Sequence, residues 1–190
     1  MGVSHLLQKV FSKFIGEKKL NTIAIIDYGM SNLSSVIRAT RYVAPNDSVI
    51  VTSKPEEIND ADKIIFPGQG AAKKCMESIV KKNLSKIIKK NSQEKPFLGI
   101  CMGMQVLMDF SEENNGTNCL GIIKGKVRKF KRKENIKLKI PHMGWNKVIQ
   151  KNDHPIWYNI DNESYFYFVH SYFIEPIDKT YVIGETVYGN

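Results

Sequence analysis

The sequence has few cysteines and no long apolar run, and each absence excludes a class of protein. Its three cysteines are an odd number without CxxC spacing, which argues against a disulfide framework and against a zinc site. No stretch approaches the ~20 apolar residues of a membrane-spanning helix, and none resembles a secretory signal. We therefore expect a protein of the reducing cytoplasm with no metal, no other cofactor and no membrane span.

The chain is basic, yet it lacks the features that would indicate nucleic acid as a partner. Its formal net charge is +9 over 190 residues, and most of the positive charge comes from lysines. Lysine-rich helix faces are usually solvated, and no nucleic-acid motif or series of stacking aromatics accompanies them. We expect no nucleic-acid partner, and we consider small anionic substrates or an acidic partner surface a better fit to this charge.

Residues 1–20 differ in pattern from the rest of the chain. Val10, Phe11 and Phe14 belong to an apolar series at helical spacing with lysines between its members, which predicts a short basic amphipathic helix. We interpret it as an appended extension, with a membrane-surface or targeting role as the alternative. Residues 21–190 contain no linker or internal repeat, so we expect them to form one domain.

The first half of this domain alternates short apolar strands with helices. Strands are expected at 23–27, 48–52, 63–66 and 96–100, with helices between them at 33–40, 54–58 and 71–90. This alternation predicts an α/β fold with an open, mostly parallel sheet and helices on both faces. Active groups gather at the carboxyl ends of such strands, and these ends carry Asp27, the turn 67–70 and Cys101.

The second half has strand-like segments that follow one another with turns between them. They lie at 126–130, 138–140, 146–149, 165–169 and 181–184. We expect the sheet to gain these strands, some of them antiparallel.

A cysteine flanked by glycines marks the end of the fourth expected strand. Cys101 stands between Gly99 and Gly103 in the thiol version of the nucleophile elbow, and an amphipathic helix is expected to follow through Leu107. The glycines let strand and helix pass closely around a strained nucleophile. A thiol at a helix N-terminus is favoured as thiolate, and the free N–H groups can stabilise an oxyanion. The alternative is a buried packing cysteine.

Five ordered motifs in this chain resemble those of one family. They are Ile26 to Asn32, Phe66 to Ala71, the elbow Leu98 to Leu107, Ile140 to Asn146 (Ile-Pro-His-Met-Gly-Trp-Asn) and Tyr167 to Tyr172 (Tyr-Phe-Val-His-Ser-Tyr). Together they resemble the class I, triad-type glutamine amidotransferases, and the last two point to the amidotransferase subunits of imidazole glycerol phosphate synthase. The resemblance implies a flavodoxin-like fold over most of the chain.

The resemblance implies that Cys101 attacks the side-chain amide of glutamine. A thioester would form, ammonia would leave, and water would then release glutamate. Backbone N–H groups of the preceding turn and of the residue after the nucleophile would hold the oxyanion, and these residues are Gly68, Gln69, Gly70 and Met102.

The resemblance also implies two residues that bind the substrate. Gln105, one helical turn after Cys101, matches a residue that positions glutamine, and Glu113 lies near a carboxylate that receives the α-amino group. From the residues alone, Gln105 could instead face solvent, and Glu113 could be a solvated loop carboxylate.

The resemblance further implies a heterodimer with a cyclase subunit built as a (β/α)₈ barrel. The docking surface would comprise Pro141, His142, Met143, Gly144, Trp145, Tyr167, His170 and Ser171. Ammonia would pass through the barrel to a phosphoribosyl substrate, away from water in which it becomes ammonium. The residues alone leave open that His142 and His170 are structural and that Trp145 and Tyr167 are core aromatics.

One part of the family's site is not found in this sequence. The family completes its triad with a His-Pro-Glu motif beyond the Tyr-Gly that is here Tyr188-Gly189, and the sequence stops at Asn190. None of its four histidines precedes Pro-Glu. We therefore expect these 190 residues, as a C-terminally incomplete domain, to lack the general base, to have little or no activity and to expose a sheet edge.

Three functions are compatible with these observations. The first is the glutaminase subunit of imidazole glycerol phosphate synthase, in histidine biosynthesis. The second is a paralogue that supplies ammonia for the amidation of cell-surface sugars. The third is a non-catalytic subunit that binds the partner, which the absence of His-Pro-Glu favours.

Overall fold

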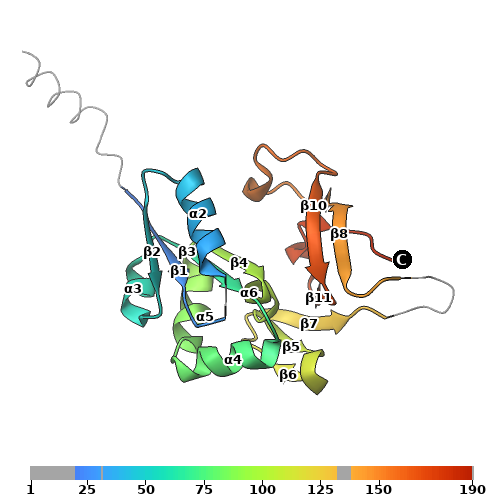
Figure 1. The fold of residues 1–190 in the computed structure, drawn as a ribbon, viewed down its shortest axis with the longest axis horizontal. Helices are drawn as coiled ribbons and strands as arrows, with labels where there is room; N and C mark the ends of the chain where they lie inside the picture. Colours follow the sequence, from blue (N-terminus) through green and yellow to red (C-terminus); the bar gives the residue numbers. More distant parts are fainter. Residues whose placement is uncertain (1–19, 31, 132–137, 190) are drawn as a thin grey trace, which may run out of the picture.

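Figure 1 shows the fold as a computed structural model, which describes residues 20–30, 32–131 and 138–189. The basic helix expected within residues 1–20 falls outside these ranges, apart from the exposed Leu20, so it stays a prediction. Among the described residues, no helix is both long and apolar enough to cross a bilayer.

Four parallel strands form the central sheet, as the sequence predicts. In sheet order they are β2 (Ser48–Thr52), β1 (Thr22–Ile26), β3 (Lys63–Gly68) and β4 (Phe97–Cys101). All three pairings are parallel, and the register places Gly68 opposite Cys101 at the carboxyl ends of β3 and β4. The expected nucleophile and the expected oxyanion turn therefore meet at one edge of the sheet.

Helices cover both faces of this sheet. α2 (Leu33–Val43) connects β1 to β2, whereas α3 (Pro55–Asp60), α4 (Ala72–Lys81) and α5 (Ser85–Glu94) belong to connections that run in the opposite direction across the sheet. Because crossovers between parallel strands are right-handed, this reversal puts α2 on one face and the other helices on the opposite face. α3 and α5 contact each other there (Figure 1).

The helix expected over 71–90 is in fact two helices. α4 ends at Lys81, and Asn83 adopts a left-handed backbone conformation with a φ of 57°. The N–H of Leu84 then donates to the carbonyl of Ile79 at 3.0 Å, which closes the helix end as in a Schellman motif. Leu84 is fully buried as a result, so the break brings one more apolar side chain into the core.

The core lies between the parallel sheet and the helices α3 to α5. Its buried side chains come from strands and helices alike: Ile26, Ile58, Ile64, Phe66, Ile79, Leu84 and Ile88. Burial of each such side chain contributes roughly 1.5–3 kcal/mol. The ring of Tyr28 joins this core, 5.3 Å from the ring of Phe66. The strand ends that carry the expected site are thus held by the core beneath them.

The helix after Cys101 is shorter than the sequence predicts. α6 spans only Met102–Gln105, and the chain then turns into β5 (Met108–Ser111). The reason is tertiary, because the N–H groups of Ile122 and Ile123 both donate to the carbonyl of Leu107 at 2.9 Å. That carbonyl is committed to another segment, so the helix does not continue, and its single turn supplies little dipole.

The second half forms separate sheets, so the expectation that its strands join the parallel sheet is wrong. One sheet has the order β11 (Tyr172–Pro176), β7 (Ile123–Lys129), β5, β6 (Thr117–Asn118), and two pairs are β8 (His142–Lys147) with β10 (Tyr165–His170) and β9 (Ile149–Gln150) with β12 (Gly184–Glu185). β7 pairs with β5 on one side and β11 on the other, which uses both of its edges. Short 3₁₀ helices lie at Glu113–Asn115, Pro155–Trp157 and Lys179–Tyr181.

Two further strand predictions in the second half are wrong. Residues 138–140 form no strand, and the stretch 181–184 contains the end of a 3₁₀ helix and only the start of β12. Both stretches contain apolar residues, but residues 138–140 pair with no described strand and β12 pairs with β9 over two residues only. Within the described residues, β4 is an edge strand of the parallel sheet. Its Leu98 and Ile100 lie on one face of the strand, and both are exposed.

Candidate active site

Cys101 lies at a sharp corner between β4 and α6. Its φ of 54° is unusual for a residue with a side chain, and its side chain is exposed. A Cβ at Gly103 would stand 1.9 Å from the carbonyl oxygen of Phe66, and a Cβ at Gly99 would stand 3.0 Å from the Cα of Met104. The corner therefore requires glycine at position 103 and fits the strained geometry of a nucleophile elbow. The buried-cysteine alternative does not apply.

The turn after β3 packs directly against this corner. A Cβ on Gly68 would lie 2.2 Å from the Tyr28 hydroxyl and 2.7 Å from the backbone nitrogen of Gly103, so the chain can pass here only as glycine. Gly70 has a φ of 90°, which also favours glycine. The motif Pro-Gly-Gln-Gly thus has a structural reason at each glycine. Gly68 lies too close to Tyr28 and Gly103 for a side chain, and Gly70 has a positive φ.

One of the four expected oxyanion donors is already engaged. The N–H of Gln69 donates to the carbonyl of Met30 at 2.8 Å, so in this conformation it does not face an oxyanion. Gly68 belongs to β3, opposite Cys101. The roles of Gly68, Gly70 and Met102 as oxyanion donors stay predictions.

Neither Gln105 nor Glu113 is a solvated surface side chain, which was the alternative for each. The side chain of Gln105 is only 7% exposed, and its Oε1 has no hydrogen-bond partner among the described residues. The Oε2 of Glu113 accepts a hydrogen bond from the N–H of Ala72 at 2.7 Å, which caps α4. Glu113 therefore ties its own loop to the first residue of α4, two positions after the glycine turn.

Two residues that the sequence reasoning did not assign to the site lie beneath it. Tyr28 and Cys75 are fully buried, and the Tyr28 hydroxyl stands 3.8 Å from the Cys75 sulfur. Cys75 reads as a packing residue in the sequence because it lacks the elbow context. For Tyr28, the sequence did offer one indication of a place near the site, because this residue follows the carboxyl end of β1.

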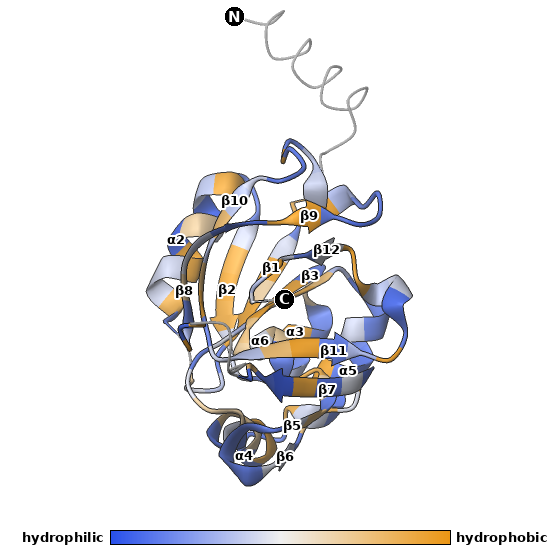
Figure 2. Cartoon of the chain, turned by 90° about the vertical axis from the view of Figure 1, so that its right-hand side faces the viewer, coloured by the Kyte–Doolittle hydropathy of each residue, from blue (hydrophilic) through white to orange (hydrophobic). Residues whose placement is uncertain are grey.

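The aromatic ribbon, which we define as the pair β8 and β10, presents two different faces. Trp145 is 69% exposed and Tyr167 56% exposed, and their rings lie 5.6 Å apart across the two strands. Met143 and Val169 are exposed on the same alternating positions. The alternative that these aromatics belong to the core is therefore wrong. Figure 2 views the side of the molecule that carries this ribbon.

The other expected interface residues are distributed around the ribbon. Pro141 precedes β8, is exposed and follows a cis peptide bond, and Gly144 has a φ of 143°. Ser171 lies between β10 and β11, and its carbonyl accepts a hydrogen bond from the N–H of Phe130.

His142 and His170 lie on the inner face of the ribbon and are joined to each other. The Nδ1 of His170 lies 2.8 Å from the carbonyl of Tyr172, which can only accept, so this nitrogen carries the proton. The Nε2 of His170 then accepts from the Nδ1–H of His142 at 3.0 Å, and the Nε2 of His142 faces the amide nitrogen of Asn146 at 3.4 Å. All three of these contacts can be hydrogen bonds only when both rings are neutral. This fits the alternative that His142 and His170 have a structural role.

This pair predicts a stability that depends on pH. Burial, and secondarily the neighbouring His170, lower the pKa of His142 below its usual value. A histidine with a lowered folded pKa stabilises the fold fully above the unfolded pKa of about 6.5, and that contribution is lost as the pH falls through the folded value. We expect the midpoint of urea unfolding to fall between pH 7.5 and 5, and His142→Gln to flatten that profile. His154→Gln, at an exposed histidine, is the control; equal slopes in all three proteins would contradict this role.

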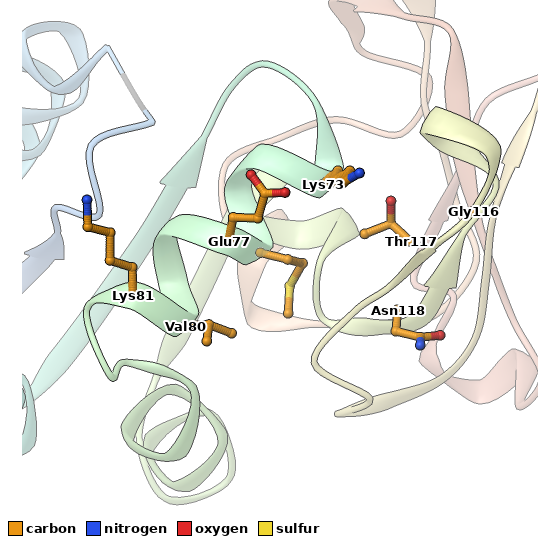
Figure 3. Close-up of a pocket in the computed structure, with 8 residues that line it drawn as sticks. Lys73, Glu77, Val80, Lys81, Gly116, Thr117 and Asn118 are labelled. Atoms are coloured by element: carbon orange, nitrogen blue, oxygen red, sulfur yellow. The ribbon is translucent and has the colours of Figure 1, made fainter.

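A pocket of about 560 Å³ lies between α4 and residues 116–118 (Figure 3). Its walls are Lys73, Met76, Glu77, Val80 and Lys81 of α4, together with residues 116–118. None of the expected site residues lines it. Among the described residues, no three His, Cys, Asp or Glu side chains gather as a metal site would need.

Comparisons with known proteins agree with this geometry. The model of the family "Glutamine amidotransferase class-I" matches residues 24–189. The chain is 52% identical over 168 residues to the imidazole glycerol phosphate synthase subunit HisH of Hydrogenovibrio crunogenus, across 88% of this chain and 79% of that relative. It is 45% identical over 173 residues to the HisH of Pseudomonas syringae pv. syringae, across 90% and 81%.

The fold has a counterpart among solved structures. A crystal structure of a glutamine amidotransferase superposes with a TM-score of 0.62 at 12% identity, over 85% of this chain and 78% of that one. The family match spans almost the whole described chain, and Cys101 lies at the elbow between a parallel strand and a helix. The chain therefore belongs to the class-I glutamine amidotransferase family.

Proposed function

We propose that this protein is the glutaminase subunit of an imidazole glycerol phosphate synthase, acting in the cytoplasm. The observation that carries the proposal is the exposed Cys101 at the elbow, opposite Gly68 of the glycine turn. The Cys101 sulfur forms a bond to the amide carbon of glutamine, the carbon–nitrogen bond breaks, and ammonia leaves with the transferred proton. Water then attacks the thioester, releases glutamate and restores the thiol.

The substrate is positioned by two side chains, Gln105 and Glu113. Gln105 offers a buried side-chain oxygen without a partner among the described residues, which suits a hydrogen bond from the substrate. Glu113 uses one carboxylate oxygen for Ala72 and has a second oxygen for the α-ammonium group of the substrate. The described histidines His142, His154 and His170 each make a hydrogen bond to a group other than Cys101.

The aromatic ribbon is the docking face for the cyclase barrel in this proposal. Its exposed Trp145 and Tyr167 have the character of interface anchors, which are enriched in aromatic residues. A tight seal has a chemical purpose, because ammonia that escapes into neutral water becomes ammonium and is no longer a nucleophile.

The docking face predicts the effect of one substitution. We expect Trp145→Ala to weaken binding of the cyclase barrel subunit by roughly 10-fold or more, as for an interface anchor. Tyr42→Ala is the matched control, because Tyr42 is also an exposed aromatic and lies in the last turn of α2. The measurement is a calorimetric titration, and an unchanged dissociation constant for Trp145→Ala would contradict the docking assignment.

The acceptor of the ammonia decides between this function and that of a paralogue. A form of the protein that is extended to include the family's His-Pro-Glu segment is mixed with the barrel subunit, the phosphoribosyl substrate of that subunit and glutamine labelled with ¹⁵N in the amide, in excess unlabelled ammonium. We expect ¹⁵N in imidazole glycerol phosphate, because channelled ammonia does not exchange with the solution. Glutamate release without this incorporation would indicate another acceptor, and docking without glutamate release would indicate a non-catalytic subunit.

A further inference from the structure

A chain of two hydrogen bonds runs from the end of β1 to the glycine turn beside Cys101. The Tyr28 hydroxyl lies 3.8 Å from the sulfur of Cys75, and that sulfur lies 3.5 Å from the carbonyl oxygen of Gln69. Tyr28 and Cys75 are both fully buried. Water therefore does not compete for these contacts, which raises the value of each weak bond.

The direction of both bonds follows from the protonation of the two groups. Burial raises the pKa of the Tyr28 phenol, and the pKa of the Cys75 thiol is raised above its usual value for the same reason. Both groups therefore keep their protons at neutral pH. The phenol donates to the sulfur, and the thiol donates to the carbonyl of Gln69.

The carbonyl of Gln69 belongs to the peptide group that joins Gln69 to Gly70. In a trans peptide the C=O and the next N–H point in opposite directions, so a fixed Gln69 carbonyl also fixes the Gly70 N–H. The Gly70 backbone has a φ of 90° and lacks a side chain that could hold it in place. The thiol contact is thus a specific restraint on one of the expected oxyanion donors.

Tyr28 is itself held at both ends. Its hydroxyl lies where a Cβ of Gly68 would stand, 2.2 Å away, so the phenol also supports the first glycine of the turn. Its carbonyl accepts a hydrogen bond from the Ser78 hydroxyl of α4. The Tyr28 side chain therefore lies against Gly68 at the end of β3 and, through Cys75, reaches the Gln69–Gly70 peptide.

We propose that Tyr28 and Cys75 are positioning residues that hold the Gln69–Gly70 peptide in the orientation needed for oxyanion stabilisation next to Cys101. They do not touch the substrate and act only through the turn. This inference rests on the proposed glutaminase function, since it concerns the same site. Packing alone would explain the burial of the two side chains, but it would not require a hydrogen-bond donor at either position.

The test compares two alkylations of Cys101 at one pH, followed by mass spectrometry of the peptide that contains it. The first reagent is a chloromethyl ketone analogue of L-glutamine, whose carbonyl must be polarised by the turn before the thiolate sulfur displaces chloride. The second is iodoacetamide, which needs only an accessible thiolate. Their ratio of rates, the selectivity, reports the turn and needs neither a general base nor turnover.

Each positioning residue is removed singly and then both together. We expect Cys75→Ala and Tyr28→Phe to lower the selectivity by roughly 3- to 10-fold each, as for the loss of one weak hydrogen bond. The double variant should show no further loss, because both residues act through one chain. Cys75→Ser keeps a donor and should recover most of the selectivity. Cys119→Ala, at a cysteine whose sulfur donates to the Thr117 carbonyl and not to the glycine turn, should leave it unchanged. Thermal unfolding of each variant shows that it is folded.

The possible failures are distinguishable. Selectivity within twofold of the parent in folded Cys75→Ala and Tyr28→Phe would overturn the positioning role, with the glutaminase proposal intact. Additive losses in the double variant, or a Cys75→Ser variant as impaired as Cys75→Ala, would also overturn it. A parent protein that reacts equally with the L- and D-forms of the ketone has no glutamine site, which would overturn both proposals.

Discussion

Replacing Gly103 with alanine is expected to lower the free energy of unfolding by about 3 kcal/mol or more, the upper range for overpacking. The added Cβ would stand 1.9 Å from the carbonyl oxygen of Phe66 and 2.8 Å from its carbonyl carbon. These atoms are backbone of β3, which pairs with β1 and β4 on its two sides, so they cannot yield as a flexible side chain would. The measurement is the midpoint of urea unfolding.

Gly99→Ala is the matched control in the same elbow. Its Cβ would meet the backbone of Met104 at 3.0 to 3.1 Å, which a shift of a few tenths of an ångström relieves. We expect its cost to stay below about 1.5 kcal/mol. A Gly103→Ala variant as stable as the parent, or no less stable than Gly99→Ala, would show that β3 and α6 are farther apart than described.

Cys101→Ser is expected to abolish the reaction with glutamine while it leaves the fold intact. Loss of a nucleophile typically lowers turnover by at least about 1,000-fold, since only binding and oxyanion contributions survive. The side chain is exposed, so its loss should change stability little. The measurement is glutamate release in the presence of the barrel subunit, by forms of both proteins that are extended to include the family's His-Pro-Glu segment, with unfolding midpoints for both proteins.

Cys119→Ser provides the comparison, because this partly buried cysteine lies outside the elbow. It should keep the parental rate. Equal and measurable rates of glutamate release in the extended parent and in its Cys101→Ser variant would mean that another group attacks the amide, and the elbow would then have no chemical role.

The parallel sheet could be predicted because its information is local. Each strand is a short apolar run that ends in a turn, and the order of strands and helices then requires a parallel sheet. The split between α4 and α5 could not be predicted from the sequence. It depends on the left-handed conformation of Asn83, which accompanies the burial of Leu84 in the core. The short α6 was not visible either, since it ends where residues 122 and 123 bind the carbonyl of Leu107.

The candidate site divides in the same way. Cys101 and the glycine turn are found from the sequence because both follow parallel strands, whose carboxyl ends converge. The contact between Tyr28 and Cys75 joins residues 47 positions apart, and a spacing of this kind leaves no periodic signal. The engagement of the Gln69 N–H depends on where Met30 lies in space, which the motif alone does not contain.

The most direct test of the nucleophile is the protection of one cysteine by one substrate. The protein is treated with the chloromethyl ketone analogue of L-glutamine, with and without excess L-glutamine, and the mass of the peptide that contains Cys101 is followed over time. We predict a single adduct on Cys101 that glutamine suppresses and that D-glutamine does not. Labelling of Cys75 or Cys119 at the same rate, or labelling of Cys101 that glutamine leaves unchanged, would contradict the assignment of this elbow as a glutamine site.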